Sequence, residues 1–195
     1  MPLVSYPEFI NAAIAGKVVS FPTDTVPALA VIPPQSERIF TLKQRTADKP
    51  LILMVAELDA IWEYVVGTPE EQAIWTAIAK KYWPGQLTLV LPASEKVPVA
   101  MNPLNYGTVG IRIPNSSIAL DILRQTGPLA TTSANLSGQP PLETMNAIVA
   151  TFPDVIALNS EYLSPTPTFS SGQPSTVIQW TDNSWKTLRQ GAIVL

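Results

Sequence analysis

The sequence of 195 residues contains neither cysteine nor histidine. A zinc site with thiolate or imidazole ligands is therefore excluded. A cysteine nucleophile, a Ser-His-Asp triad and a histidine general base are excluded as well. No disulfide can form, which is compatible with a reducing compartment. Covalent catalysis is disfavoured, so any chemistry has to come from positioning and charge neutralisation, as in most phosphoryl and adenylyl transfer.

Charged residues are also few, at 14%, while hydrophobic residues make up 46%. Disordered chains have the opposite composition, and the length fits one domain of about 100–200 residues. With no repeat or linker, we predict a single domain over residues 1–195. The net charge of −3 does not favour nucleic acid. No secretory signal is evident and no apolar run approaches the ~20 residues of a membrane helix, so we expect a cytoplasmic protein without a membrane segment.

Strand and helix patterns alternate over most of the chain. Capping residues and apolar periodicity predict helices at about 5–15, 36–44, 58–66, 69–82, 116–125 and 144–151. Apolar and β-branched runs predict strands at 17–21, 28–32, 51–55, 87–91, 108–113, 129–132, 155–158, 176–180 and 185–188. Two neighbouring strand pairs, 17–21 with 28–32 and 176–180 with 185–188, have no helix between them. We therefore predict an α/β fold with a mixed parallel and antiparallel sheet rather than a purely parallel one.

Positive charges and hydroxyl-rich turns together suggest an anion site. The chain has no Gly-x-x-x-x-Gly-Lys loop and no Gly-x-Gly-x-x-Gly motif, so the two common phosphate-binding motifs are absent. Polar turns at 23–25 and 133–138 follow predicted strands, where ligand contacts are frequent. The candidate cations are Lys43, Arg45, Lys49, Arg112 and Arg189.

Each of these features also has a purely structural interpretation. Lys43 and Arg45 follow a predicted helix, where cations complement the helix dipole. The segment 133–138 has the composition of an ordinary turn. Arg112 shares the polar face of its strand with Thr108 and Gly110, so it faces either solvent or a ligand. The residues alone therefore support an anion-binding α/β domain, which fits a nucleotide enzyme.

Seven segments that are weak singly occur in a specific order and spacing. They are Phe21-Pro22-Thr23-Asp24-Thr25-Val26, Lys43-x-Arg45 before Lys49-Pro50-Leu51-Ile52, Trp83-Pro84-Gly85-x-Leu87-Thr88-Leu89, Thr108-Val109-Gly110-Ile111-Arg112-Ile113-Pro114, Ser133-Ala134-Asn135-Leu136-Ser137-Gly138, Pro174-Ser175-Thr176-Val177-Ile178 and Leu188-Arg189-x-Gly191. Together they resemble the YrdC-type domain, the family of threonylcarbamoyl-AMP synthases. The resemblance implies a twisted α/β sheet around a large positively charged cleft, in a length that matches the single-domain form.

The resemblance also implies an activity. Such enzymes form threonylcarbamoyl-AMP and pyrophosphate from L-threonine, bicarbonate and ATP, for threonylcarbamoylation of tRNA adenosine 37. Threonine's amine attacks a bicarbonate-derived carbon, and the carbamate then attacks the α-phosphorus of ATP. Mg²⁺ shares the phosphate charge. The implied partners are tRNA-modifying proteins, with RNA or tRNA contact as a further expectation.

Site residues follow from the same motifs. The implied catalytic residues are Lys43, Arg45, Ser133 and Asn135, which also contact ATP together with Lys49, Thr108 and Arg189. The implied threonine contacts are Thr23, Thr25, Thr131, Ser175 and Thr176. No protein metal ligand is implied. The loop 164–175 is expected to close over the site and exclude water from a labile carbamate.

The sequence departs from the family pattern at three positions. Pro27-Ala28 stands where Tyr-Gly is usual, Met54 where some members have a threonine-contacting histidine, and Pro174 where an acidic residue is usual. Two alternatives therefore stay open. One is a protein of this fold that binds double-stranded RNA without synthase activity; the other is a paralogous ATP-dependent enzyme with a different acceptor.

Overall fold

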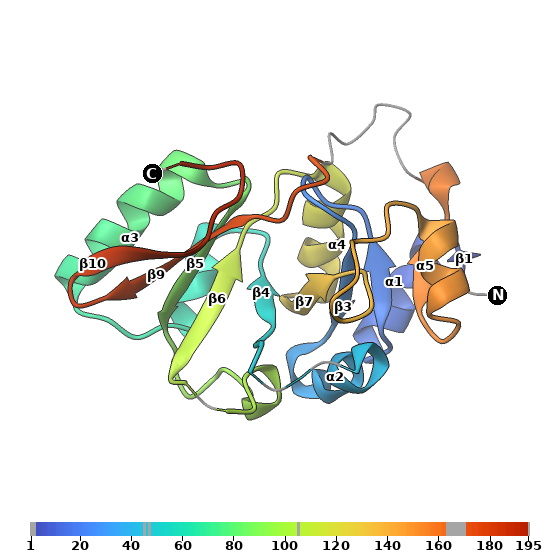
Figure 1. The fold of residues 1–195 in the computed structure, drawn as a ribbon, viewed down its shortest axis with the longest axis horizontal. Coiled ribbons are helices and arrows are strands. Elements are labelled where there is room, and N and C mark those ends of the chain that lie inside the picture. Colours follow the sequence, from blue (N-terminus) through green and yellow to red (C-terminus); the bar gives the residue numbers. More distant parts are fainter. Residues whose placement is uncertain (1–2, 45, 47, 105, 163–170, 195) are drawn as a thin grey trace.

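One mixed β-sheet runs through the whole molecule (Figure 1). The computed structural model describes residues 3–44, 46, 48–104, 106–162 and 171–194. The strand order is β1-β8-β2-β3-β7-β4-β6-β5-β9-β10, with parallel and antiparallel neighbours. The strands are β1 (Leu3–Val4), β2 (Val19–Phe21), β3 (Ala28–Val31), β4 (Ile52–Met54), β5 (Leu87–Pro92), β6 (Thr108–Arg112), β7 (Leu129–Ser133), β8 (Ile156–Leu158), β9 (Thr176–Thr181) and β10 (Ser184–Arg189).

The helices lie on both sides of this sheet. Capping boxes start the first and third α-helices: Ser5 with Glu8, and Thr68 with Glu71. The α-helices are α1 (Tyr6–Ile14), α2 (Glu37–Lys43), α3 (Pro69–Tyr82), α4 (Ser117–Thr126) and α5 (Met145–Thr151). The 3₁₀ helices are η1 (Pro33–Gln35), η2 (Leu58–Glu63), η3 (Val99–Met101) and η4 (Ser160–Tyr162). No helix among the described residues is long and apolar enough to cross a membrane.

The mixed-sheet prediction is confirmed by the pairing. The two strand pairs without a helix between them, β2 with β3 and β9 with β10, are both antiparallel. Asp182 and Asn183 have positive φ values of 50° and 56°, which suits the tight hairpin turn between β9 and β10. The helix predicted at 58–66 is the 3₁₀ helix η2, which is shorter and ends at Glu63. Strand β1 was not predicted, because two residues carry no detectable pattern.

The helices cover the two sheet faces unequally, and this leaves room for a site. On one face a large core runs the length of the sheet, from α3 with Trp75 to α5 with Ile148. On the other face α1 and α4 pack over β2, β3 and β7, with buried residues such as Phe9 and Ile122. That second cluster contains no residue of β5, β6 or β9. The cover on this face therefore stops near the middle of the sheet.

A row of paired residues crosses the sheet where this cover stops. Thr131 pairs with Ile52, Ile52 with Gly110, Gly110 with Val90, and Val90 with Gln179. Paired residues share a face. Thr131 is buried, whereas the other four are only half-buried. The sheet thus offers an accessible floor next to the edge of the α1–α4 layer.

Candidate active site

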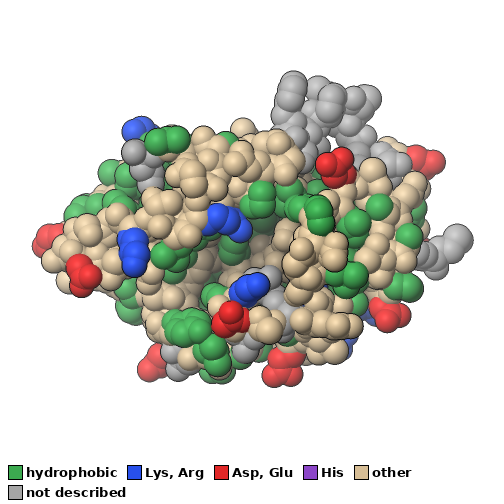
Figure 2. Space-filling model, in the orientation of Figure 1, with side chains coloured by type: hydrophobic (Ala, Val, Ile, Leu, Met, Phe, Trp, Pro, Cys, Tyr) green, Lys and Arg blue, Asp and Glu red, His purple; other side chains and the backbone are tan. Residues whose placement is uncertain are grey.

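A cavity of about 120 Å³ opens where the α1–α4 layer ends. Figure 2 shows this face hollowed near its centre, with Lys or Arg side chains at the edge. Half of the lining is apolar: Val26, Pro27, Ala28, Pro50, Ile52, Met54 and Pro174. The other half is polar or cationic: Thr25, Arg112, Thr131, Thr132, Ser133, Ser175 and Arg189. No acidic side chain lines this cavity among the described residues, so it suits a small anion with an apolar part.

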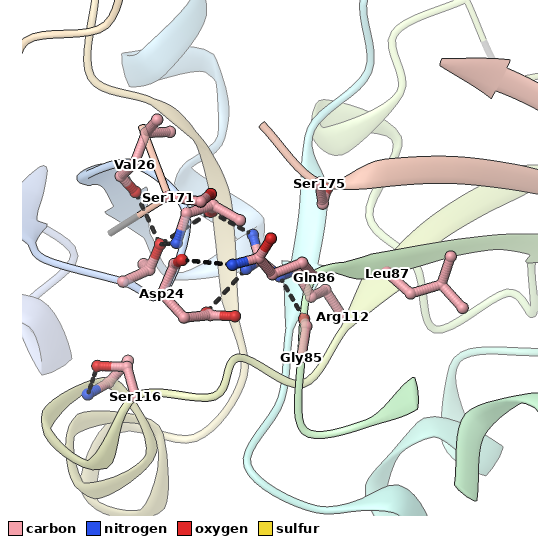
Figure 3. Close-up of polar contacts among 12 residues, drawn as sticks. Asp24, Val26, Gly85, Gln86, Leu87, Arg112, Ser116, Ser171 and Ser175 are labelled. Atoms are coloured by element: carbon pink, nitrogen blue, oxygen red, sulfur yellow. Dashed lines mark hydrogen bonds and ion pairs between the residues drawn. The ribbon is translucent and has the colours of Figure 1, made fainter. Parts of the chain in front are cut away.

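Arg112, at the end of β6, is the buried cation of the cavity (Figure 3). Its side chain is 4% exposed, and three of its nitrogens have separate acceptors. Nε donates to the Gly85 carbonyl at 3.0 Å, Nη1 to Thr25 Oγ1 at 2.7 Å and Nη2 to Asp24 Oδ1 at 2.8 Å. Burial lowers the pKa of Arg112 and the Asp24 carboxylate opposes that shift. Arginine nonetheless keeps its charge at neutral pH, so the guanidinium is a fixed cation.

The turn after β2 holds its shape through its own hydroxyls. Thr23 Oγ1 donates to the Val26 carbonyl at 2.7 Å and accepts from the Thr25 backbone N–H at 3.2 Å. It also lies 3.0 Å from Thr25 Oγ1. Thr23 is fully buried, so it shapes the turn, whereas Thr25 reaches the cavity wall. Of the two predicted threonine contacts on this turn, only Thr25 lines the cavity.

Arg189, at the end of β10, lies at the cavity rim. Its Nε and Nη2 donate to the Ser175 carbonyl at 3.0 and 2.8 Å, and Nη2 also reaches Ser175 Oγ at 3.2 Å. Ser175 Oγ is in turn 2.8 Å from Thr88 Oγ1 on β5. Desolvation lowers the pKa of Arg189, and the nearby charge of Arg112 lowers it further. The two guanidiniums are therefore close enough to repel each other.

Lys43 is a second buried cation, which does not line the cavity itself but bonds to the lining residue Ser133. It is 1% exposed although it ends α2. Nζ donates to the Ser133 carbonyl and to Asn135 Oδ1, the latter at 3.1 Å. Asn135 is itself fixed, because Nδ2 donates to the carbonyls of Leu136 and Gln139 at 2.8 Å and Oδ1 accepts from Ser133 Oγ at 2.5 Å. Ser133 and Asn135 thus hold the ammonium group, and their own donors are engaged within the loop.

The structure brings most, but not all, of the predicted site residues together. Thr25, Thr131, Ser133, Ser175 and Arg189 line the cavity, and Lys43 and Asn135 bond to Ser133. Thr131 Oγ1 donates to the Ile52 carbonyl at 2.9 Å, so its hydroxyl proton is directed at the backbone.

Three predicted residues lie elsewhere. Thr108, at the start of β6, lines a separate cavity of about 350 Å³ with Asn102. The Thr176 hydroxyl is directed at the C-terminal segment, where it bonds to the backbone of Gly191 and Ile193. Lys49 is exposed on the segment that precedes β4.

Two predictions fall wholly or partly on residues that the structure does not describe. Arg45 lies outside the described residues, and its predicted role stays a prediction. The expected loop 164–175 is described only from residue 171 onward. There, Ser171 N–H donates to the Asp24 carbonyl at 3.2 Å and Gly172 N–H to the Thr25 carbonyl at 3.0 Å. This end of the loop is therefore joined to the turn that forms the cavity wall.

Sequence reasoning missed the partner of Arg112. Asp24 was noted in its turn but given no role, and Arg112 was assigned to solvent or a ligand rather than to an ion pair. Gln86, whose Nε2 donates to the Asp24 carbonyl at 2.9 Å, was missed too. The available signal was a single acidic residue between two threonines and a single charge in an apolar strand. Neither observation predicts that Asp24 and Arg112, which are 88 positions apart in the sequence, form an ion pair.

Comparison with known proteins gives a consistent result. The sequence model of the Sua5_yciO_yrdC family, described as telomere recombination, matches residues 11–191. A threonylcarbamoyl-AMP synthase of Pyrococcus abyssi is 42% identical over 129 residues, which are 64% of this chain and 37% of that protein. A threonylcarbamoyl-AMP synthase of Bacillus subtilis is 37% identical over 131 residues, 64% of this chain and 36% of that protein. The chain thus spans little more than a third of these curated relatives.

Solved structures agree with the sequence matches. The crystal structure of P. abyssi Sua5 complexed with L-threonine superimposes with a TM-score of 0.79 at 32% identity. That alignment covers 93% of this chain and 52% of the Sua5 chain. The mixed sheet with flanking helices is therefore the fold of these proteins.

Proposed function

The chain belongs to the Sua5/YciO/YrdC family, and from that premise we propose that it is an L-threonylcarbamoyladenylate synthase. It would convert L-threonine, bicarbonate and ATP into threonylcarbamoyl-AMP, pyrophosphate and water. Support comes from the two curated relatives named for this activity and from the relative whose crystal structure contains L-threonine. These names favour the synthase over an RNA-binding protein without catalysis.

The observation that carries the proposal is the arrangement of cations on two sides of one small cavity. Arg112 and Arg189 line it from β6 and β10. Lys43 does not line it but bonds to the lining residue Ser133 on β7, which lies on the other side of β4 in the strand order. An amino acid with its carboxylate on the guanidiniums would place its amine toward the Lys43 side. A nucleotide is too large for about 120 Å³ and has to extend out of the cavity. The half-buried row Ile52–Gly110–Val90 provides an accessible surface for that extension.

In this proposal each group acts by positioning or by charge. Arg112 binds the carboxylate through charge-assisted hydrogen bonds. Arg189, which the motifs assign to ATP, is proposed here to bind the same carboxylate, because it lines the cavity with Arg112. Thr25, Thr131 and Met54 surround the rest of the amino acid. Lys43 neutralises phosphate charge that develops when pyrophosphate leaves. Lys49, Thr108 and Arg45 stay predicted ATP contacts, and Thr23 and Thr176 shape the turn and the tail around the cavity.

Mg²⁺ would arrive with the nucleotide. Among the described residues, no group of three or more Asp, Glu, His or Cys side chains could hold a metal ion. Magnesium is commonly held by substrate phosphates and water with few protein ligands. The ion would therefore share the phosphate charge with Lys43. The product would pass to tRNA-modifying partner proteins in the cytoplasm.

The test is pyrophosphate release from Mg-ATP and bicarbonate, with and without L-threonine. We expect release that depends on threonine and is lost in Lys43→Ala, while Lys80→Ala on the exposed face of α3 keeps it. Thermal unfolding of both variants shows that they are folded. ATP binding without a threonine response would contradict the proposal and indicate another acceptor. Salt-dependent binding of double-stranded RNA without ATP turnover would favour the RNA-binding alternative.

A further inference from the structure

The carboxylate behind the cavity has one oxygen without a partner. Asp24 is 6% exposed, and its Oδ1 accepts from Arg112 Nη2 at 2.8 Å. Its Oδ2 is buried and has no hydrogen-bond partner. A buried carboxylate oxygen without a donor is costly. A fold that needed only a hydrogen-bond acceptor for Arg112 could use an amide or a carbonyl, so the full negative charge of Asp24 calls for an explanation.

The charges around the cavity explain why this position carries a carboxylate. Arg112 and Arg189 both line it, and Arg189 is destabilised as a cation by Arg112. Two guanidinium charges beside one small cavity would by themselves favour an anion with more than one charge, such as phosphate. Asp24 does not line the cavity, but it pairs with Arg112 from behind. With Asp24 included, the net charge of this side falls from +2 to +1.

We propose that Asp24 is a positioning and specificity-determining residue that makes this side of the cavity select a carboxylate over a phosphate. A net charge of +1 matches the single charge of an amino-acid carboxylate. Phosphate groups carry close to two charges at neutral pH, so a net charge of +1 matches them less well. This inference rests on the proposed function, in which the amino acid binds on this side and ATP on the other.

Asp24 also fixes the direction of the guanidinium. Arg112 Nη2 has no other acceptor than Asp24 Oδ1 among the recorded hydrogen bonds of the described residues. Asp24 is fixed in turn, because its carbonyl accepts from Gln86 Nε2 and from the Ser171 N–H. Replacing the carboxylate by an amide keeps the shape but removes the charge. The variant Asp24→Asn therefore separates the electrostatic role from packing.

The experiment measures inorganic phosphate binding by isothermal titration calorimetry, without ATP or turnover. We expect Asp24→Asn to bind phosphate at least about tenfold more tightly than the unmodified protein, since the adjacent counter-charge is gone. The double variant Asp24→Asn/Arg189→Gln should lose this gain, which locates the new site. Asp24→Glu keeps the charge and should show no gain. The Michaelis constant for L-threonine should rise in Asp24→Asn.

The control removes the same charge at an exposed ion pair. Asp121→Asn disrupts the Asp121–Arg124 contact on α4 and should leave phosphate affinity unchanged. If Asp24→Asn does not fold, Asp24→Ser provides a second uncharged variant. A role in stability alone predicts weaker or equal phosphate binding in either folded variant, and that result would overturn the proposal.

The outcome is independent of the synthase assay. Absence of threonine-dependent pyrophosphate release would contradict the proposed function. The phosphate titration would still decide whether Asp24 lowers the anion affinity of the cavity.

Discussion

Gly191 offers a test of how the chain's last segment supports the cavity, through the variant Gly191→Ala. A Cβ at this position would lie 2.5 Å from the Pro174 carbonyl oxygen, 2.6 Å from the Thr176 nitrogen and 2.8 Å from the Ser175 carbonyl carbon. All three are backbone atoms of one stretch, well inside the ~3.5 Å of normal contact. The backbone at 174–176 or the tail has to move.

The expected loss of stability follows from this crowding. Overpacking typically costs about 1–3 kcal/mol, and with three backbone contacts we expect Gly191→Ala to cost about 3 kcal/mol. For a domain of this size that corresponds to a fall in Tm of about 6–12 °C. The displaced stretch includes the Ser175 carbonyl, which accepts two hydrogen bonds from Arg189. We therefore expect the Michaelis constant for L-threonine to rise as well.

Differential scanning calorimetry and threonine-dependent pyrophosphate release measure the two effects. Gly127→Ala is the matched control: Gly127 has a φ of +75° and open space around it. An alanine there costs about 1–3 kcal/mol through backbone strain, and Gly127 does not line the cavity. A Tm of Gly191→Ala within about 2 °C of the unmodified protein would refute the packing argument. A lower Tm with an unchanged Michaelis constant would refute the link to the cavity.

Three further predictions concern named side chains. Arg112→Lys keeps the charge but cannot reach three separate acceptors, so we expect about a 100-fold loss of threonine-dependent pyrophosphate release. The buried acceptors left without a donor should cost about 1–3 kcal/mol in urea titration, and near-normal activity would contradict the role of the guanidinium. Thr176→Val removes a buried hydroxyl that makes three hydrogen bonds to the backbone of Gly191 and Ile193. The variant should lose about 2–4 kcal/mol of stability in the same urea titration. A loss near zero would show that the C-terminal segment is held by other contacts. Hydrogen bonds from Thr68 and Trp180 lower the pKa of Glu71 below its ordinary 4.5. The Glu71 carboxylate therefore stabilises the fold at a pH above 4.5, and this stabilisation is lost as the pH falls through the lowered pKa of the folded protein. The Tm advantage of the unmodified protein over Glu71→Gln should therefore shrink between about pH 6 and about pH 3, and an advantage that grows on acidification would show the sign to be wrong.

Local patterns predicted the elements well because their causes are local. The helix at 69–82 was placed correctly from Thr68, Pro69 and Glu71, since a capping box and a first-turn proline act within one turn. The helix at 58–66 is shorter than predicted because Val65 pairs with the distant Ala93 in a β-bridge, which the local pattern does not encode. The strand order, by contrast, depends on pairings between distant segments, such as β5 with β9, which no local pattern encodes.

The candidate site divides in the same way. Ser133 and Asn135 were found because they form one short polar loop, and Arg189 was found as one of the few cations of the chain. Asp24 was missed because its partner is brought alongside only by the fold. Thr108 was expected to contact ATP, but it lies at the other end of β6 from Arg112. Each residue of a strand adds about 3.3 Å, so the two side chains open toward different cavities.

The strand order also has a consequence for synthesis of the protein. The cavity takes wall residues from the turn after β2 and from the last residue of β10, which lie far apart in the chain. In the proposed function, the carboxylate side of the cavity is therefore complete only once Arg189 has left the ribosome. From that moment, a bound amino acid would join the turn after β2 to the end of β10 and stabilise the completed fold by mass action. A cell rich in this ligand would accordingly protect freshly made protein during the final step of its folding.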